Sequence, residues 1–269
     1  MSILHAIVLG LVQGLTEFFP VSSSGHLAIV PWLFGWDDFG DNESLAKAFD
    51  VALHMGTLAG ALAYFRADVA RYTRAGLTAA RSEDGRMAWL LLASAIPAAI
   101  VGALLNDTIS RLDDEIGPIA VMLIVFGFVL LAADRLRGER NVGQFRFRDA
   151  AAMGLGQALA LEPGVSRSGV TISVARAVGF DRDAAARLSF LMSLPIIAGA
   201  GIFSGIDVLG EGGIPSDFWP PFLWGMLASG ITGWVAVWAT LKIVRTRSFA
   251  PFVVYRTALG VFVLLVLAF

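Results

Sequence analysis

The stretch QGLTEFFPVSSSGH, Gln13–His26, returns in outline 144 positions later as QALALEPGVSRSGVT, Gln157–Thr171. At this constant spacing, identical residues occur at Gly10/Gly154, Leu11/Leu155, Gln13/Gln157, Leu15/Leu159, Val21/Val165, Ser22/Ser166, Ser24/Ser168 and Gly25/Gly169. Ungapped identity at one spacing is typical of an internal duplication. Both copies set a loop rich in serine and glycine inside apolar sequence, and broken helices of this kind occur in membrane proteins built from inverted repeats.

The composition places the chain in a membrane. Of its 269 residues, 57% are hydrophobic and 16% are charged, whereas soluble domains are about 45–50% apolar and about 25% charged. The absence of cysteine excludes disulfides and thiol chemistry. The net charge of −2 argues against a nucleic-acid partner. The N-terminus lacks the basic segment of a cleavable signal and is expected to remain in the mature protein.

Each copy of the repeat begins with apolar segments too short to span a bilayer, which needs about 20 residues. Residues 3–36 and 150–178 are therefore predicted to form re-entrant helical hairpins, whose polar tips must be surrounded by protein or water. Six full spans are predicted at 49–65, 87–105, 118–133, 188–208, 219–241 and 252–269. The predicted fold is an all-α polytopic membrane protein, a single domain over residues 1–269. It comprises six transmembrane helices plus two re-entrant hairpins in an inverted-topology repeat, with copies at about 1–134 and 149–269.

The basic residues test this topology. The segments 66–86, 134–149, 176–187 and 242–250 hold 16 of the 20 lysines and arginines. The alternate loops are acidic and hold only Lys47 and Arg111. Because basic loops face the cytoplasm, the first hairpin should enter from the outer face and the second from the inner face. Both termini are then predicted outside, in a multi-pass protein of the inner or plasma membrane.

Ionisable residues at the hairpin tips are candidate functional residues, since charge at membrane depth is costly. Glu17 and His26 lie at the first tip and Arg167 at the second. An ion pair between Glu17 and Arg167 that only joins the hairpins is the structural alternative. However, six hydroxyl groups are expected to converge on the same place: Ser22, Ser23, Ser24, Ser166, Ser168 and Thr171.

This set of residues suits phosphoryl chemistry. The planar guanidinium of arginine matches phosphate oxygens, and N–H groups at a helix start bind anions where glycine permits close approach. A hydroxyl beside histidine and glutamate is the arrangement of an activated nucleophile. The phosphate-binding residues are therefore predicted to be Ser22, Ser24, Gly25, Ser166, Ser168, Gly169 and Thr171.

The two stretches resemble the signature motifs of the undecaprenyl-diphosphate phosphatase family, the integral-membrane type linked to bacitracin resistance. The first motif is matched by Gln13, Glu17, Pro20, Ser22, Ser23, Gly25 and His26. The second is matched by Pro163, Gly164, Ser166, Arg167, Ser168, Gly169 and Thr171. The sequence departs from the family pattern at Glu162, where an apolar residue is usual, and at Phe19, where leucine is usual. The resemblance implies hydrolysis of a C55 polyprenyl diphosphate to the monophosphate carrier used for cell-wall precursors.

The resemblance also makes Glu17, Ser23, His26 and Arg167 the expected catalytic set. In our hypothesis Ser23 attacks the distal phosphorus, His26 shuttles the proton and Arg167 neutralises the phosphate oxygens. Glu17 orients His26 or binds a metal. Direct attack by His26, and a water positioned by Ser23, are the alternatives. The family requires a divalent cation, Mg²⁺ or Ca²⁺, for which Glu17 and Gln13 are the candidate ligands.

The expected partner is a polyprenyl diphosphate lipid, for which bacitracin competes indirectly by binding the lipid itself; a homodimer is left open. A transporter or flippase of polyprenyl phosphate is the alternative function, because inverted repeats with broken helices also build transporters. A purely structural subunit would leave the tip charges unexplained. Glu162 is either an extra metal ligand or a solvated loop residue. Arg256 either contacts substrate or snorkels to the inner face. His5 and His54 are expected to be buried histidines whose hydrogen bonds are satisfied.

Overall fold

The fold is described from a computed structural model, over residues 1–40, 42–112, 115–210 and 213–269. Acidic positions 41, 113, 114 and 211, assigned above to outer loops, lie outside this description. The described part is helical and contains no β-strand, which confirms the all-α class. Its helices are α1 (Ile3–Phe18), α2 (Ser23–Phe34), α3 (Glu43–Tyr64), α4 (Arg66–Thr78), α5 (Glu83–Leu112), α6 (Ile116–Asp134), α7 (Phe147–Leu159), α8 (Arg167–Ala177), α9 (Arg182–Gly210), α10 (Trp219–Val244) and α11 (Ala250–Ala268), with short 3₁₀ turns at Val142–Gln144 and Ser216–Phe218.

The long apolar helices match the predicted spans. Within the described residues, five segments are long and apolar enough to cross a membrane: Glu83–Leu105, Ile116–Asp134, Arg182–Ile206, Ser216–Val244 and Ala250–Ala268. The bent pair α3–α4 passes the same test of length and composition when it is taken as one broken span, which brings the number to six. The chain is therefore an integral, polytopic membrane protein.

One polar connection differs from the prediction. Residues 66–86 were expected to be a loop, but α4 occupies 66–78 and bends 86° away from α3. The bend lies at Phe65, which ends one helix and starts the next and is almost fully buried. The sequence of α4 contains no proline and several residues that favour helix, so it can form one. Arg187 of α9 holds α4 in place by an ion pair to Asp68 at 2.8 Å.

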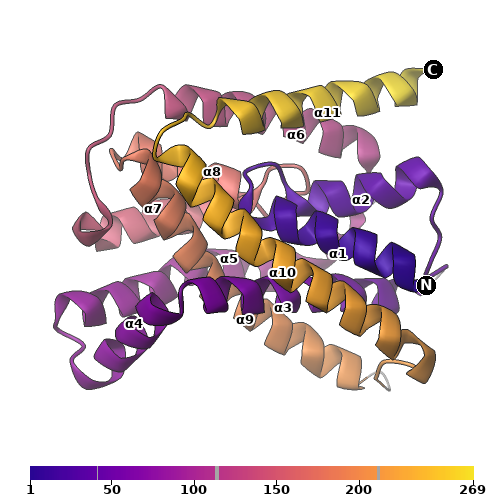
Figure 1. The fold of residues 1–269 in the computed structure, drawn as a ribbon, viewed down its shortest axis with the longest axis horizontal. Coiled ribbons are helices and arrows are strands. Elements are labelled where there is room, and N and C mark those ends of the chain that lie inside the picture. Colours follow the sequence, from indigo (N-terminus) through magenta and orange to yellow (C-terminus); the bar gives the residue numbers. More distant parts are fainter. Residues whose placement is uncertain (41, 113–114, 211–212) are drawn as a thin grey trace.

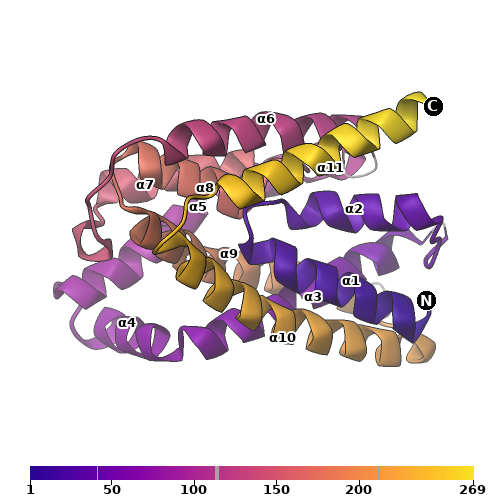
Figure 2. The ribbon, with the colours of Figure 1, turned by 45° about the horizontal axis from the view of Figure 1, so that its top comes forward.

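The two short helix pairs meet in the middle of the molecule. Figure 1 shows both termini at one end, with α1 and α2 on that side and α7 and α8 toward the other. Helix α1 packs along α10, and α7 packs along α5. Figure 2 shows α11 lying beside α6, above α2. This arrangement suits hairpins that enter from opposite faces; the repeat boundaries and their inverted relation stay a prediction.

Glycines let α1 approach α10 closely. A Cβ atom on Gly10 would collide with the carbonyl oxygen of Gly225, and one on Gly14 would lie 2.5 Å from that of Ser229. Small residues at helix contacts allow such backbone proximity within membranes. The close packing fixes the position of the last turn of α1, which carries Glu17.

Candidate active site

The two serine-rich loops have the same unusual backbone. Ser22 and Ser166 have φ angles of +75° and +76°, the only positive values among the described non-glycine residues. Each serine caps the following helix, since its Oγ accepts the N–H of Gly25 at 3.3 Å or of Gly169 at 3.1 Å. A non-glycine residue held in this region stores about 1–3 kcal/mol of strain, and such strain clusters at functional sites.

Arg256 holds both loops in place. Its side chain is completely buried in α11. The guanidinium donates to the carbonyl oxygens of Leu123 (2.9 Å), Pro20 (3.2 Å), Gly164 (2.7 Å) and Val165 (3.1 Å). These hydrogen bonds tie the segments just before the strained serines to α6. Arg256 therefore neither snorkels to the inner face nor is free to contact substrate, and its role is structural.

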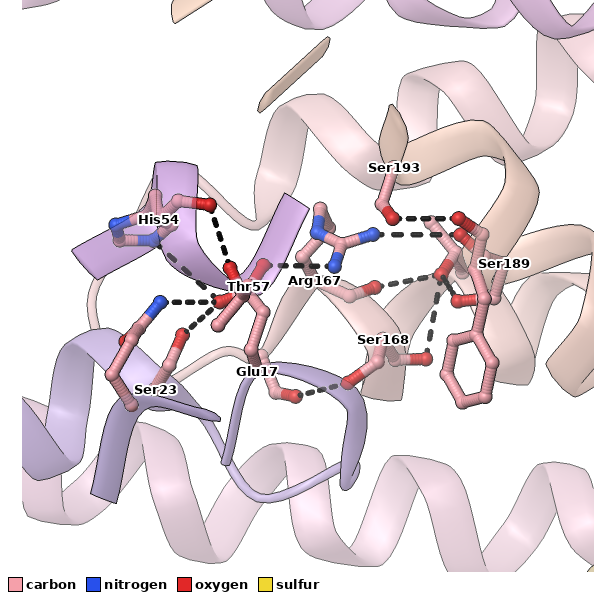
Figure 3. Close-up of polar contacts among 12 residues, drawn as sticks. Glu17, Ser23, His54, Thr57, Arg167, Ser168, Ser189 and Ser193 are labelled. Carbon is pink, nitrogen blue, oxygen red and sulfur yellow. Dashed lines mark hydrogen bonds and ion pairs between the residues drawn. The ribbon is translucent and has the colours of Figure 1, made fainter. Parts of the chain in front are cut away.

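Glu17 is the centre of the site (Figure 3). Its side chain is only 4% exposed. One carboxylate oxygen, Oε1, accepts a hydrogen bond from Arg167 at 2.9 Å, which joins the two hairpins. The other, Oε2, accepts from Ser23 Oγ at 2.6 Å and from Gln13 Nε2 at 3.1 Å. The Nε2 atom of His54 lies 3.5 Å from the same oxygen. The carboxylate is thus placed to receive the hydroxyl proton of Ser23.

His26 has different neighbours from those expected. Its Nδ1 lies 2.6 Å from the carbonyl oxygen of Ser22, and its Nε2 lies 2.9 Å from the hydroxyl of Tyr255. Within the described residues, no hydrogen bond joins His26 to Ser23 or to Glu17. The hypothesis that His26 takes the Ser23 proton, and that Glu17 orients His26, therefore finds no contact here; Glu17 occupies the position next to the hydroxyl.

The predicted phosphate-binding hydroxyls fall into two groups. Ser24 is exposed and Ser23 is partly exposed. In the second copy, Ser168 is buried and donates to the carbonyl oxygen of Phe19 at 3.1 Å. Thr171 is fully buried and lies 2.6 Å from Ser189 Oγ. The accessible hydroxyls therefore belong to the first loop, and those of the second loop shape the fold.

A cavity of about 550 Å³ adjoins the site. Ser24 and His54 line it, together with Asp50, Asp37 and Trp32. His54 therefore stands between the cavity and Glu17, whose carboxylate lies 3.5 Å from its Nε2 atom.

The donors around Glu17 fit only part of a cation site. No group of three histidine, cysteine, aspartate or glutamate residues suited to a metal occurs in the described chain. The buried Oε1 of Gln13 lacks a hydrogen-bond partner there, but so does the corresponding atom of Gln157, although the position equivalent to Glu17 is Leu161 in that copy. One carboxylate and one amide oxygen suit Mg²⁺ that is bound mainly through substrate phosphates.

Sequence reasoning missed the roles of two residues. His54 was expected to be an ordinary buried histidine, but its side chain is 32% exposed and contacts Glu17. Tyr255 was not considered. Its only signal was a tyrosine next to an arginine inside an apolar span. Of the other candidates, His5 pairs with Asp38 at 2.8 Å, away from the site, and half-buried Glu162 has no ion pair within the described residues.

Comparisons with known proteins agree over nearly the whole chain. The family described as bacitracin resistance protein BacA matches residues 6–262. A Geobacter metallireducens protein named undecaprenyl-diphosphatase is 46% identical over 273 residues, covering 98% of each chain. Proteins of the same name from Desulforudis audaxviator (97% of each chain) and Nocardioides sp. (98% of this chain, 96% of the relative) are 44% and 43% identical.

Proposed function

This chain belongs to the bacitracin resistance protein BacA family and hydrolyses undecaprenyl diphosphate, and we propose that Glu17, Ser23 and Arg167 carry out that reaction. The observation that carries the proposal is the 2.6 Å hydrogen bond from Ser23 to a carboxylate whose other oxygen meets Arg167. A hydroxyl activated by an adjacent base is the usual form of a serine nucleophile. The names of the relatives favour hydrolysis over the transporter alternative.

In the first step Ser23 Oγ attacks the distal phosphorus. The new Oγ–P bond forms as the P–O bond to the proximal phosphate breaks, and undecaprenyl phosphate leaves with the bonding electron pair. The hydroxyl proton of Ser23 passes to Glu17 Oε2. The result is a phosphoserine and a neutral Glu17.

In the second step water attacks the phosphoserine. Its hydroxyl stays on phosphorus, its other proton leaves to solvent, and the Oγ–P bond breaks. Glu17 returns its proton to Ser23 Oγ, which restores the starting site and releases inorganic phosphate. In this proposal the water enters from the cavity lined by Ser24 and His54.

Arg167 supplies charge to both steps. A guanidinium has five N–H donors; within the described residues, two are used, by Glu17 at 2.9 Å and by the Ser189 carbonyl at 3.4 Å. In this proposal the remaining donors meet phosphate oxygens, and the exposed Ser24 hydroxyl is a further donor to them. The other predicted phosphate-binding residues, Ser22, Gly25, Ser166, Ser168, Gly169 and Thr171, act by shaping the loops.

A divalent cation, Mg²⁺ or Ca²⁺, accompanies the diphosphate in this proposal. Glu17 and Gln13 would hold it from the protein side. When bound, it would neutralise charge on the phosphate oxygens. Support comes from the type of donor atoms, since oxygen ligands suit both ions.

The proposal extends to the membrane in which the protein lies, its orientation and the action of bacitracin. The protein lies in the inner or plasma membrane with both termini outside, as the distribution of basic residues favours. Bacitracin acts, in this proposal, by sequestering the lipid substrate. Because the chain is free of cysteine, one cysteine appended to either terminus and probed with an impermeant maleimide reads the orientation.

Phosphate release by detergent-solubilised protein tests the function. Micelles have no second side, so a transporter without hydrolase activity would release none. Brief reaction with substrate labelled in the distal phosphate, quenched in denaturing detergent at mildly alkaline pH, should leave label on Ser23, and this label should survive later acid treatment because a phosphoserine is acid-stable. Label that is lost in acid and maps to His26 would reverse the assignment, and turnover without any phosphoenzyme would favour direct attack by water.

A further inference from the structure

Tyr255 connects α11 to the nucleophile through His26. The carbonyl oxygen of Ser22 can only accept a hydrogen bond, so the Nδ1 atom of His26, 2.6 Å away, carries the proton. In the neutral ring the lone pair then lies on Nε2, and the Tyr255 hydroxyl donates to it at 2.9 Å. The two rings are also stacked, 11° from parallel. The hydrogen bonds run from phenol to imidazole to the strained residue just before Ser23.

The second copy of the loop shows that the backbone turn does not need this connection. Ser166 has nearly the same φ as Ser22, yet the position of His26 is taken there by Val170, which offers only its backbone N–H to the Ser166 carbonyl, at 2.9 Å. An imidazole and its phenol partner therefore occur only in the copy that carries the hydroxyl nucleophile. Their contribution is to orientation and not to folding of the turn.

Tyr255 is well supported for such a role. Its neighbour Arg256 is fully buried and bound to four carbonyl oxygens, so the backbone of α11 is fixed at this point. His26 is only 4% exposed, whereas Tyr255 is 50% exposed. The Tyr255 phenol thus covers one side of the buried His26 ring. With it in place, both ring nitrogens of His26 have a hydrogen-bond partner.

We propose that Tyr255 is a positioning residue of the reaction, which fixes the tautomer and orientation of His26 and thereby aims Ser23. His26 then braces the Ser22 turn and does not accept the Ser23 proton. This inference rests on the proposed function of Ser23 as nucleophile. Loss of one neutral hydrogen bond changes a rate about threefold to tenfold.

The test combines kinetics with a spectroscopic signature. Tyr255→Phe keeps the stacked ring and removes only the hydroxyl; Tyr64→Phe removes a phenol that packs on Trp234 instead. We expect Tyr255→Phe to lower kcat for phosphate release about threefold to tenfold with KM unchanged, and Tyr64→Phe to match wild type. The chain has three histidines, so ¹⁵N-histidine NMR should show the His26 ring signals shifted in Tyr255→Phe and those of His5 and His54 unmoved.

Three results would overturn the inference. The first two are an unchanged kcat in Tyr255→Phe and a lowered kcat with unmoved His26 ring signals. The third is an equal loss in Tyr64→Phe, because the effect would then not depend on His26. If the wild type releases no phosphate, the proposed function fails, while the ring signals still decide whether Tyr255 holds His26.

Discussion

Replacing Arg256 should destabilise the two serine-rich loops of the site, in addition to removing a charge next to them. Arg256→Met keeps most of the side-chain volume but leaves four buried carbonyl oxygens without their donor. Each unpaired buried acceptor costs about 1–3 kcal/mol. The methionine variant also avoids the cost of burying a cation, and this gain offsets part of that loss. Taking about 1 kcal/mol for each carbonyl, the variant should lose about 4 kcal/mol of folding free energy.

The assay is thermal unfolding in detergent alongside phosphate release. At about 2–4 °C per kcal/mol for a chain of this size, the melting temperature of Arg256→Met should fall by about 10 °C. Arg256→Lys keeps the charge, but its single ammonium cannot reach all four oxygens, so it should lose roughly half as much. Arg247→Met changes an exposed arginine in the loop before α11 and serves as control. A wild-type melting temperature with reduced kcat in Arg256→Met would refute the structural role and make Arg256 a substrate contact.

Four further predictions concern the site and its loops. Arg167→Ala should slow phosphate release about 10²–10³-fold, because the developing phosphate charge loses its fixed donors; initial rates measure this. Ser23→Ala should leave no acid-stable phosphoenzyme in the quench experiment. His54→Gln keeps a polar side chain beside Glu17 and should retain kcat within about tenfold, whereas His54→Leu should lose more, since it places an apolar side chain 3.5 Å from a buried carboxylate oxygen. Gly164→Ala should lower stability by about 1–3 kcal/mol, because φ is +89° and the new Cβ would lie 2.5 Å from the Ile119 carbonyl oxygen, as melting curves would show.

Gly40→Ala is the matched control for the last of these, since Gly40 also has a positive φ but its Cβ would meet nothing within 4 Å. Equal losses at both glycines would mean that backbone strain alone, and not the packed loop, explains the effect. Full activity in Arg167→Ala would show that the site is misplaced. Equal kcat in the glutamine and leucine variants of His54 would exclude a polar role for that residue.

The architecture was predictable because it depends on segment length and on charge. The apolar segments at 3–36 and 150–178 each contain a polar loop where a span would need unbroken apolar sequence, and basic residues mark one side. The proximity of Glu17 and Arg167 was expected because the two tips were predicted to meet, and their ion pair had been weighed as the structural alternative. What could not be predicted was side-chain direction around a tight turn. Glu17 and His26 lie at the two ends of the first tip, and only the positive φ at Ser22 decides that Ser23 faces Glu17.

The residues that sequence reasoning missed lie on helices outside the motifs. His54 reaches Glu17 from α3, and Tyr255 reaches His26 from α11, more than 200 positions away. Such contacts depend on how helices pack, and no local pattern encodes that. The helix at 66–78 was missed for a related reason, since its polar, arginine-rich sequence suits either a loop or a surface helix.

Arg256 is synthesised 236 positions after Pro20, yet it fastens the loop to which Pro20 belongs. During synthesis this loop can therefore reach its final geometry only once α11 has been inserted. A product truncated before α11 would still carry every motif residue and most of the spans, but its serines would lack the support that aims them. Such truncated copies in the membrane would be inert toward the lipid carrier.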